Sequence, residues 1–358
     1  MGNEPIPVVT AQGTHRQVGR QIGEAMRETL ESILDRQRET LPSDVSWTEV
    51  LARSQPFLDA SRAVYPQYVE ELEGIAEAIE RPTNEVFVGL CEELWEGAFW
   101  RGCTDFAARG RATVDGMTLL AHTNDLMPEA EEDLVILRVE AEEEPEFLAV
   151  SVGGLGWSAG LNAAGIGLTG NEVSSSDVRS GVPRQLVVRA ILGAQRLGEA
   201  MDACLLPQRA SSYNNVIADA WGEVYSMEGS ATDCEPIYID GDILAHANHY
   251  VSPPMRRFEA DRSENGGSIF RHNRAMRLLR ESFGQLSPDR LRELLADHAN
   301  YPVSICKHGL ETVTVFSIII DLEARRAWIG RGRPCETTYV EHQLKRYPRV
   351  PGARGVSR

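Results

Sequence analysis

The stretch Gly102-Cys103-Thr104-Asp105 marks the point at which the pattern of the sequence changes. Before it, in residues 1–102, apolar side chains recur at helical spacing after capping residues such as Thr14. After it, short strand-like runs alternate with turn residues, and only a few helices interrupt them. Strands that follow one another directly, rather than alternating with helices, predict antiparallel sheets covered by helices, which is an α+β fold.

The expected elements extend from this junction in both directions. Residues 1–102 are predicted to form a helical leader, in which the helical stretch after Ser46 is interrupted at Pro56. Residues 103–344 are predicted to form a β-rich body in one domain with the leader, and residues 345–358 a loose basic tail. Helices are expected after Pro183 and at about 267–284 and 287–298, and strands are expected in or near 118–121, 134–137, 147–150, 165–169, 215–220, 223–227, 237–239, 243–247, 313–320 and 327–330.

The composition restricts the partners of the chain. It has 358 residues, of which 42% are apolar, so it can bury a sizeable core. The 53 acidic residues against 36 basic ones give a net charge of −17, which disfavours nucleic acid and anionic membranes as partners. No apolar run is long enough to span a membrane and the start lacks a signal-peptide pattern, so the cytoplasm is the expected location. The oligomeric state stays open, a homo-oligomer included.

A cysteine that follows a glycine at the first strand suggests a specific reaction. The Cys103 thiolate can attack the carbonyl of Gly102, which has no side chain to hinder it, and give a thioester by an N-to-S shift. Water would then release a new N-terminus at Cys103, whose α-amino group has an ordinary pKa of about 7.7–8.0 and can act as a base. The alternative is a buried structural cysteine.

Three other motifs match by letters but lack their structural context. Gly165-x-Gly167-x-x-Gly170 is followed by a loop rather than by the helix that a dinucleotide site needs. Gly156-x-Ser158-x-Gly160 fits a nucleophile elbow, but a poor helix follows it. His246-Ala247-Asn248-His249 reads as a strand end without a third metal ligand, and the six cysteines show no zinc spacing. We therefore expect no cofactor and no metal site.

Several segments, in the same order, resemble the penicillin acyltransferase (isopenicillin-N acyltransferase-like) family of N-terminal nucleophile hydrolases. The resemblance extends over about 300 residues. The segments that carry it are Gly13-Thr14-His15-Arg16-Gln17-Val18-Gly19, Gly102-Cys103-Thr104, Asn124-Asp125, Gly160-Leu161-Asn162-Ala163-Ala164-Gly165 with Asn171, His246-Ala247-Asn248-His249, and Asn300-Tyr301-Pro302-Val303-Ser304-Ile305-Cys306.

The resemblance implies a four-layer αββα fold and autoproteolysis between Gly102 and Cys103, after which the leader stays as a cleaved α fragment. It implies Cys103 as nucleophile, Asp125 as the carboxylate that orients its amine and thiol, and Asn248 and Asn171 as amide donors to an oxyanion. Thr104 and Ser230 match family positions close to the substrate.

Two departures from the family pattern bear on the substrate. Lys307 stands where the family has an arginine, and Glu311 lies near a second arginine position. Both would contact substrate, and a carboxylate there favours a substrate with a free amine over the polyanion coenzyme A.

The sequence thus predicts a self-processing cysteine amidohydrolase that cleaves a linear C–N amide bond of a small molecule through a thioester. An acyltransferase that uses the same acyl-enzyme is the first alternative. The others are a serine hydrolase that uses Ser158 and a fold of the same kind that only binds an amide.

Overall fold

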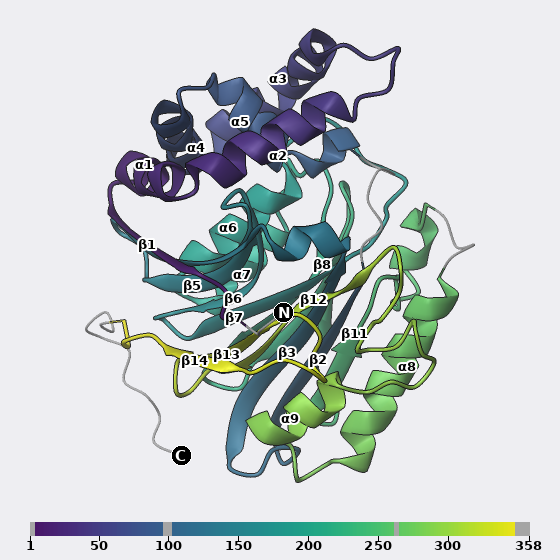
Figure 1. Cartoon of the computed structure of the whole chain (residues 1–358). Coiled ribbons are helices and arrows are strands. Elements are labelled where there is room, and N and C mark those ends of the chain that lie inside the picture. Colours follow the sequence, from purple (N-terminus) through teal and green to yellow (C-terminus); the bar gives the residue numbers. More distant parts are fainter. Residues whose placement is uncertain (1–3, 96–101, 261–264, 348–358) are drawn as a thin grey trace.

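Two β-sheets dominate the structure, a computed structural model that describes residues 4–95, 102–260 and 265–347. The eight-stranded sheet has the order β1-β4-β5-β6-β7-β8-β9-β10, and the six-stranded sheet has the order β11-β2-β3-β12-β13-β14 (Figure 1). The strands are β1 (Val8–Gly13), β2 (Gly102–Gly110), β3 (Gly116–Leu126), β4 (Leu134–Ala141), β5 (Phe147–Val152), β6 (Gly156–Asn162), β7 (Ile166–Glu172), β8 (Tyr213–Asp219), β9 (Val224–Gly229), β10 (Cys234–Tyr238), β11 (Ile243–His246), β12 (Val313–Asp321), β13 (Arg326–Arg331) and β14 (Val340–Gln343).

The helices cover the two outer faces of this pair of sheets. On the eight-stranded side lie α1 (His15–Ala25), α2 (Arg27–Glu39), α3 (Trp47–Val64), α4 (Pro66–Ile79), α5 (Thr83–Leu90), α6 (Arg184–Gly193) and α7 (Leu197–Cys204). On the six-stranded side lie α8 (Gly266–Glu281) and α9 (Pro288–Leu295), as Figure 1 shows. Short 3₁₀ turns occur at Glu92–Trp95, Pro128–Glu131 and Met255–Phe258.

Three apolar cores correspond to the three interfaces between these four layers. The first packs the leader helices, α6 and α7 against the eight-stranded sheet. The second lies between the sheets and includes Ala107, Leu120 and Phe316. The third joins the six-stranded sheet to α8 and α9 and includes Phe106 and Leu119. Alternate residues of β2 and β3 thus enter different cores, as the period of a strand requires. The predicted four-layer αββα sandwich is confirmed.

The leader differs from its prediction at two points. Residues Val8–Gly13, which precede the helix expected after Thr14, form a strand, β1, that the prediction of a helical leader did not include. Strand β1 pairs in parallel with β4, whereas the other strand pairs among the described residues are antiparallel. Helix α3 continues through Pro56 instead of breaking there. Proline removes one backbone hydrogen bond, but the buried side chains of Phe57 and Leu58 keep the helix packed on the core.

Most other elements lie close to their predicted places, but the single helix expected after Pro183 is divided into α6 and α7, and strands β6 and β14 were not predicted. Gly165 has a positive φ in the turn between β6 and β7, which matches a glycine in a tight hairpin rather than a phosphate loop. Leu344, the last residue of the body, is buried, and in the tail the Tyr347 amide donates to Ala163 O at 2.9 Å, so the first residues of the tail are attached to the body. Residues 348–358 lie outside the described part of the chain. Among the described residues, no helix combines the length and apolar character of a membrane span.

Candidate active site

The pairing of β2 with β3 sorts the polar residues of the junction onto two faces. Cys103 lies opposite Asn124, and Asp105 lies opposite His122. These four side chains follow the alternation of Ala107 and Leu120, so they point between the two sheets. They therefore form one continuous polar row next to the apolar core.

Behind the Cys103 thiol lies a buried histidine–aspartate pair. His122 Nδ1 lies 2.7 Å from Asp105 Oδ1, and both side chains are fully buried. Because Nδ1 is engaged by the carboxylate, Nε2 faces the other way, and the imidazole forms its second hydrogen bond with Cys103. Burial alone would lower the pKa of His122, but the hydrogen bonds to Asp105 and Cys103 outweigh it and raise the pKa to about 10. A proton is thus held on the imidazole beside the thiol.

Asp125 lies on the opposite face, directly beneath Gly102. The two residues are paired across the strands, and a Cβ at position 102 would lie 2.7 Å from Asp125 Oδ2. Asp125 is fully buried, its Oδ1 accepts from Thr314 Oγ1 at 2.7 Å, and burial raises the pKa of its carboxyl although Arg271 and Lys307 lower it. The Asp125 carboxyl therefore lies next to the backbone at the expected cleavage point.

A buried arginine on α8 contacts the same backbone. Arg271 Nη1 donates to the carbonyl oxygen of Cys103 and to Thr104 Oγ1, the latter at 2.9 Å. Its Nη2 donates to Asn248 Oδ1 at 2.9 Å. A guanidinium that donates from two nitrogens in this way fixes β2 against the loop that carries Asn248.

Asn248 holds the backbone nitrogen of Cys103. Its Oδ1 accepts from the Cys103 N–H at 2.9 Å as well as from Arg271, and its Nδ2 donates to Glu172 O at 3.0 Å. Two donors meet at Oδ1, so the orientation of the amide is determined by its partners. Both the oxygen and the nitrogen of the Asn248 side-chain amide are therefore hydrogen-bonded. Asn248 contacts Cys103 as an acceptor from its backbone N–H, whereas an oxyanion would need a donor.

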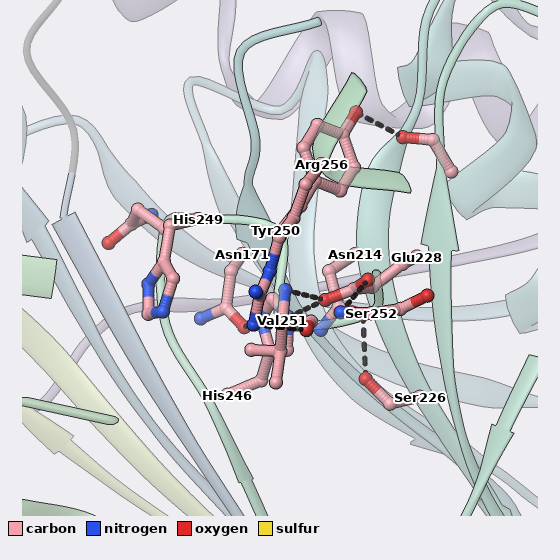
Figure 2. Close-up of polar contacts among 12 residues, drawn as sticks. Asn171, Asn214, Ser226, Glu228, His246, His249, Tyr250, Val251, Ser252 and Arg256 are labelled. Atoms are coloured by element: carbon pink, nitrogen blue, oxygen red, sulfur yellow. Dashed lines mark hydrogen bonds and ion pairs between the residues drawn. The ribbon is translucent and has the colours of Figure 1, made fainter. Parts of the chain in front are cut away.

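The loop with Asn248 is anchored by Glu228, as Figure 2 shows. This buried carboxylate accepts from the backbone N–H groups of Val251 and Ser252 at 2.6 and 2.9 Å, and lies 2.7 Å from His246 Nε2. His246 Nδ1 lies in turn 3.1 Å from Asn171 Oδ1. Burial would raise the pKa of Glu228, but these hydrogen bonds lower it. A charged, fully bonded carboxylate therefore fixes the loop against β9.

A cavity of about 530 Å³ opens in front of the Cys103 side chain. Cys103, Asn124 and Ser158 lie at its polar end, and apolar side chains such as Leu155 and Trp157 form much of its wall. Its size and its apolar lining with a few polar groups are typical of a small-molecule site.

Carboxylates outnumber cations around this cavity. Glu92, Glu129, Asp133 and Glu172 are among its lining residues, whereas Arg36 is the basic one in the described part of the lining. Arg36 is paired with Asp133 at 2.5 Å. Glu92 and Glu172 are in turn paired with Arg184 at 2.7 and 3.1 Å. The four lining carboxylates therefore exceed the two guanidiniums paired with them, and this excess of negative charge suits a cationic group.

Other predicted site residues do not belong to the described lining of the cavity. Asn171 is buried on β7, and its Nδ2 has no hydrogen-bond partner among the described residues. Thr104 faces α8 through its bond to Arg271. Ser230 Oγ donates to Asp177 at 2.9 Å. Lys307 is close enough to Asp125 and Cys103 for their charges to act on it, whereas Glu311 is exposed.

Ser158 does not have the surroundings of a nucleophile elbow. Strand β6 runs through the whole motif from Gly156 to Asn162, so no strand-to-helix turn presents the hydroxyl. Ser158 Oγ accepts from Asn124 Nδ2 at 2.7 Å. The serine is thus a strand residue at the wall of the cavity.

The sequence reasoning missed His122, Asp105 and Arg271. His122 and Asp105 belong to no recognisable sequence motif, and only the register of β2 with β3 places them side by side. Arg271 lies 168 residues from Cys103 along the chain, in a helix rich in arginine. For His122, the alternation of β3 could have given a signal, because an inward-pointing histidine two residues before Asn124 shares its face.

The four-layer sandwich, with a cysteine at the start of an inner strand and a cavity in front of it, defines the class of N-terminal nucleophile hydrolases. The family model for acyl-coenzyme A:6-aminopenicillanic acid acyl-transferase matches residues 112–336, and the chain belongs to that family. The match begins after Cys103, so it covers the body but not the nucleophile candidate.

Similar proteins include both transferases and hydrolases. The chain is 25% identical over 342 residues to an acyl-coenzyme A:6-aminopenicillanic-acid-acyltransferase of Emericella nidulans, with 91% of this chain and 92% of that protein covered. It is 22% identical over 383 residues to a beta-alanyl-dopamine/carcinine hydrolase of Drosophila melanogaster, with 93% and 95% covered. Among solved structures, a conjugated bile acid hydrolase of Clostridium perfringens gives a TM-score of 0.42 at 9% identity, covering 70% of this chain and 100% of that one.

Proposed function

We propose that this chain is a self-processing cysteine amidohydrolase that cleaves a linear amide bond of a small molecule. The observation that carries the proposal is the position of Cys103 at the wall of the cavity. Its thiol is hydrogen-bonded to His122, and its backbone N–H donates to Asn248 Oδ1. The residues that a thiol nucleophile and a new N-terminus require thus converge on one position.

Processing needs a base before the α-amine exists. In the uncut chain the Cys103 nitrogen belongs to an amide and cannot take up a proton, so we assign this task to His122. Because the pKa of His122 is raised to about 10, the proton lost by the Cys103 thiol rests on His122 Nε2, and imidazolium and thiolate face each other. The thiolate attacks the carbonyl carbon of Gly102, and the imidazolium gives the proton to the departing Cys103 nitrogen. Water then hydrolyses the thioester and leaves a carboxylate on Gly102. Asp105 orients the imidazole throughout.

The mature site would use the same groups on an external amide. Asn248 Oδ1 holds the new α-amine, Asp125 and Arg271 flank it, and Cys103 attacks the substrate carbonyl. Asn171 is the amide donor that we assign to the oxyanion, since its buried Nδ2 is without a partner among the described residues. The leaving amine of the substrate takes up the proton that came from the Cys103 thiol. Water then hydrolyses the thioester and releases the acyl group as a carboxylate.

The cavity favours a substrate with a positive charge. Its carboxylates suit the free amine of an aminoacyl amide, and one relative is a beta-alanyl-dopamine/carcinine hydrolase by name. The other relative is an acyltransferase, which would follow if a second amine rather than water resolved the thioester. We place hydrolysis first because water needs no second pocket.

Intact mass spectrometry of the purified protein tests the proposal. Wild type should give two fragments, residues 1–102 and 103–358, and Cys103→Ala should remain a single chain. Ser158→Ala is the matched control, because Ser158 also lines the cavity, and it should be cut like wild type. A wild-type chain that stays intact and inactive would indicate a binding protein, and loss of activity only in Ser158→Ala would indicate a serine hydrolase.

A further inference from the structure

Away from the cavity, four metal-binding side chains converge where the segment before β12 meets the chain after β13. They are His298, Cys306, His308 and Cys335, and one donor atom from each lies within 4.8 Å of all the others. Cys306 is buried and His308 is half-buried, whereas His298 and Cys335 are exposed and open the group to solvent. Two thiols and two imidazoles are a ligand set that zinc prefers.

The distances between the donor atoms match a tetrahedron. Bonds of about 2.3 Å to sulfur and about 2.05 Å to nitrogen require edges of about 3.8 Å between sulfurs, about 3.3 Å between nitrogens and about 3.6 Å between the two kinds. The two Sγ atoms lie 3.5 Å apart and the two Nε2 atoms 3.1 Å apart. His308 Nε2 lies 3.5 Å from each sulfur. The two remaining edges, from His298 to each sulfur, are within 4.8 Å, so a central cation needs only small side-chain shifts to reach ordinary bond lengths.

The alternatives to a cation explain less of this arrangement. A disulfide needs an S–S bond of about 2.05 Å, well short of the 3.5 Å between Cys306 and Cys335, and it gives the histidines no role. Arg333, whose positive charge would repel a bound cation, lies 3.3 Å from His308 Nδ1. This charge is offset by Glu336, which lies 3.1 Å from Arg333.

We propose that His298, Cys306, His308 and Cys335 bind one structural Zn²⁺ ion. Four protein ligands close the coordination sphere, so the ion fastens the segment between α9 and β12 to the chain after β13 rather than acting on a substrate. That segment contains Lys307, whose backbone N–H donates to Thr314 Oγ1 at 2.9 Å. Thr314 Oγ1 donates in turn to Asp125 at 2.7 Å. The ion would therefore stabilise the surroundings of Asp125 through Lys307 and Thr314.

The test uses the reduced full-length protein with Co²⁺ and Zn²⁺ as probes. Wild type, freed of metal with a chelator, should bind about one equivalent of Co²⁺ and show the visible absorption of a tetrahedral ion with two thiolate ligands. Zn²⁺ should displace the Co²⁺ and raise Tm. Cys335→Ser, which changes an exposed side chain and should fold normally, should lose the bands and the rise in Tm.

Cys234→Ser is the matched control, because Cys234 is a half-buried thiol outside the group, and it should bind like wild type. Failure of reduced wild type to bind stoichiometric metal would overturn the proposal. So would unchanged binding in Cys335→Ser, or a Cys306–Cys335 disulfide in metal-free protein isolated under non-reducing conditions with thiols blocked by alkylation. None of these readouts depends on chain cleavage or turnover.

Discussion

His122 Nδ1 and Asp105 Oδ1 lie 2.7 Å apart across the β2–β3 pair, and both side chains are sealed from water. A carboxylate and an imidazole buried together are costly unless each satisfies the other, and breaking such a pair by removing one partner destabilises a protein. Because the imidazole also contacts Cys103, this pair couples the stability of the fold to the chemistry at the junction.

The pair predicts how stability depends on pH. The pKa of His122 is raised from 6.5 to about 10, so the stabilisation by its charged form is complete below pH 6.5 and is lost as the pH rises through about 10. The difference in urea midpoint between wild type and His122→Gln should therefore be largest near pH 6 and shrink toward pH 10. A difference that stays constant over this range would contradict the assignment. The Cys103→Ala background keeps both chains uncut during the measurement. It retains Asp105, the larger cause of the raised pKa, but removes the contribution of Cys103, so the difference should disappear at a lower pH than in wild type.

The same histidine should control the rate of processing. His122→Gln retains a hydrogen-bonding side chain of similar size but cannot carry the proton, so cleavage should slow by about 10²-fold or more. The time course of fragment formation after synthesis, followed by mass spectrometry, measures this. Cleavage at the wild-type rate would exclude His122 as the base.

A single methyl group should block cleavage. In Gly102→Ala the new Cβ would lie 2.7 Å from Asp125 Oδ2, closer than carbon and oxygen approach, so the Gly102 carbonyl must move from its position. Gly198→Ala provides the control, since a Cβ there would have no heavy atom within 4 Å and its φ is not positive. We expect an uncut Gly102→Ala chain and a cut Gly198→Ala chain. Efficient cleavage of Gly102→Ala would show that the backbone there can relax.

Arg271 should matter for turnover more than its distance along the chain suggests. Arg271→Met leaves buried acceptors on Thr104 and Asn248 short of donors, which should lower the free energy of unfolding by about 1–3 kcal/mol. It should also lower kcat/KM about tenfold or more, with partial recovery in Arg271→Lys. Arg277→Met on the exposed side of the same helix is the control. Equal kcat/KM in both methionine variants would remove Arg271 from the site.

The charge of the cavity predicts selectivity for amine-bearing substrates. An aminoacyl amide should be cleaved faster than its N-acetylated analogue, and Glu129→Gln should reduce this ratio because Glu129 lines the cavity. Glu311→Gln tests the residue that the sequence indicated. Glu311 is exposed and does not belong to the described lining, so we expect the ratio to stay as in wild type. The reverse pattern would place the substrate amine at Glu311.

The layers of the fold could be predicted from the sequence because periodicity and turn residues report local structure. For the candidate site, short motifs indicated Cys103, Asp125 and Asn248, whose roles stay predictions. The partners Asp105 and His122 depend on strand register, which a sequence without its sheet does not contain.

The group around Cys306 was missed for a related reason. His298, Cys306, His308 and Cys335 have no zinc-finger spacing, and Cys335 joins the others only through the return of the chain after β13. Strand β1 was missed because its parallel partner, β4, lies about 130 residues away, as in the pairing of Val8 with Ile136, so no neighbouring hairpin signal marks it as a strand.

Strand β1 and the leader helices complete an apolar core whose other half belongs to the body, so a cut at Gly102 would not separate the parts. It would, however, change the molecularity of folding. The uncut chain folds in a unimolecular reaction whose rate does not depend on concentration. Once cut, the same structure is a heterodimer of two fragments that must meet again after denaturation. Its refolding would become second order. The processed protein would therefore stay folded under native conditions, but its refolding rate would fall as the solution is diluted.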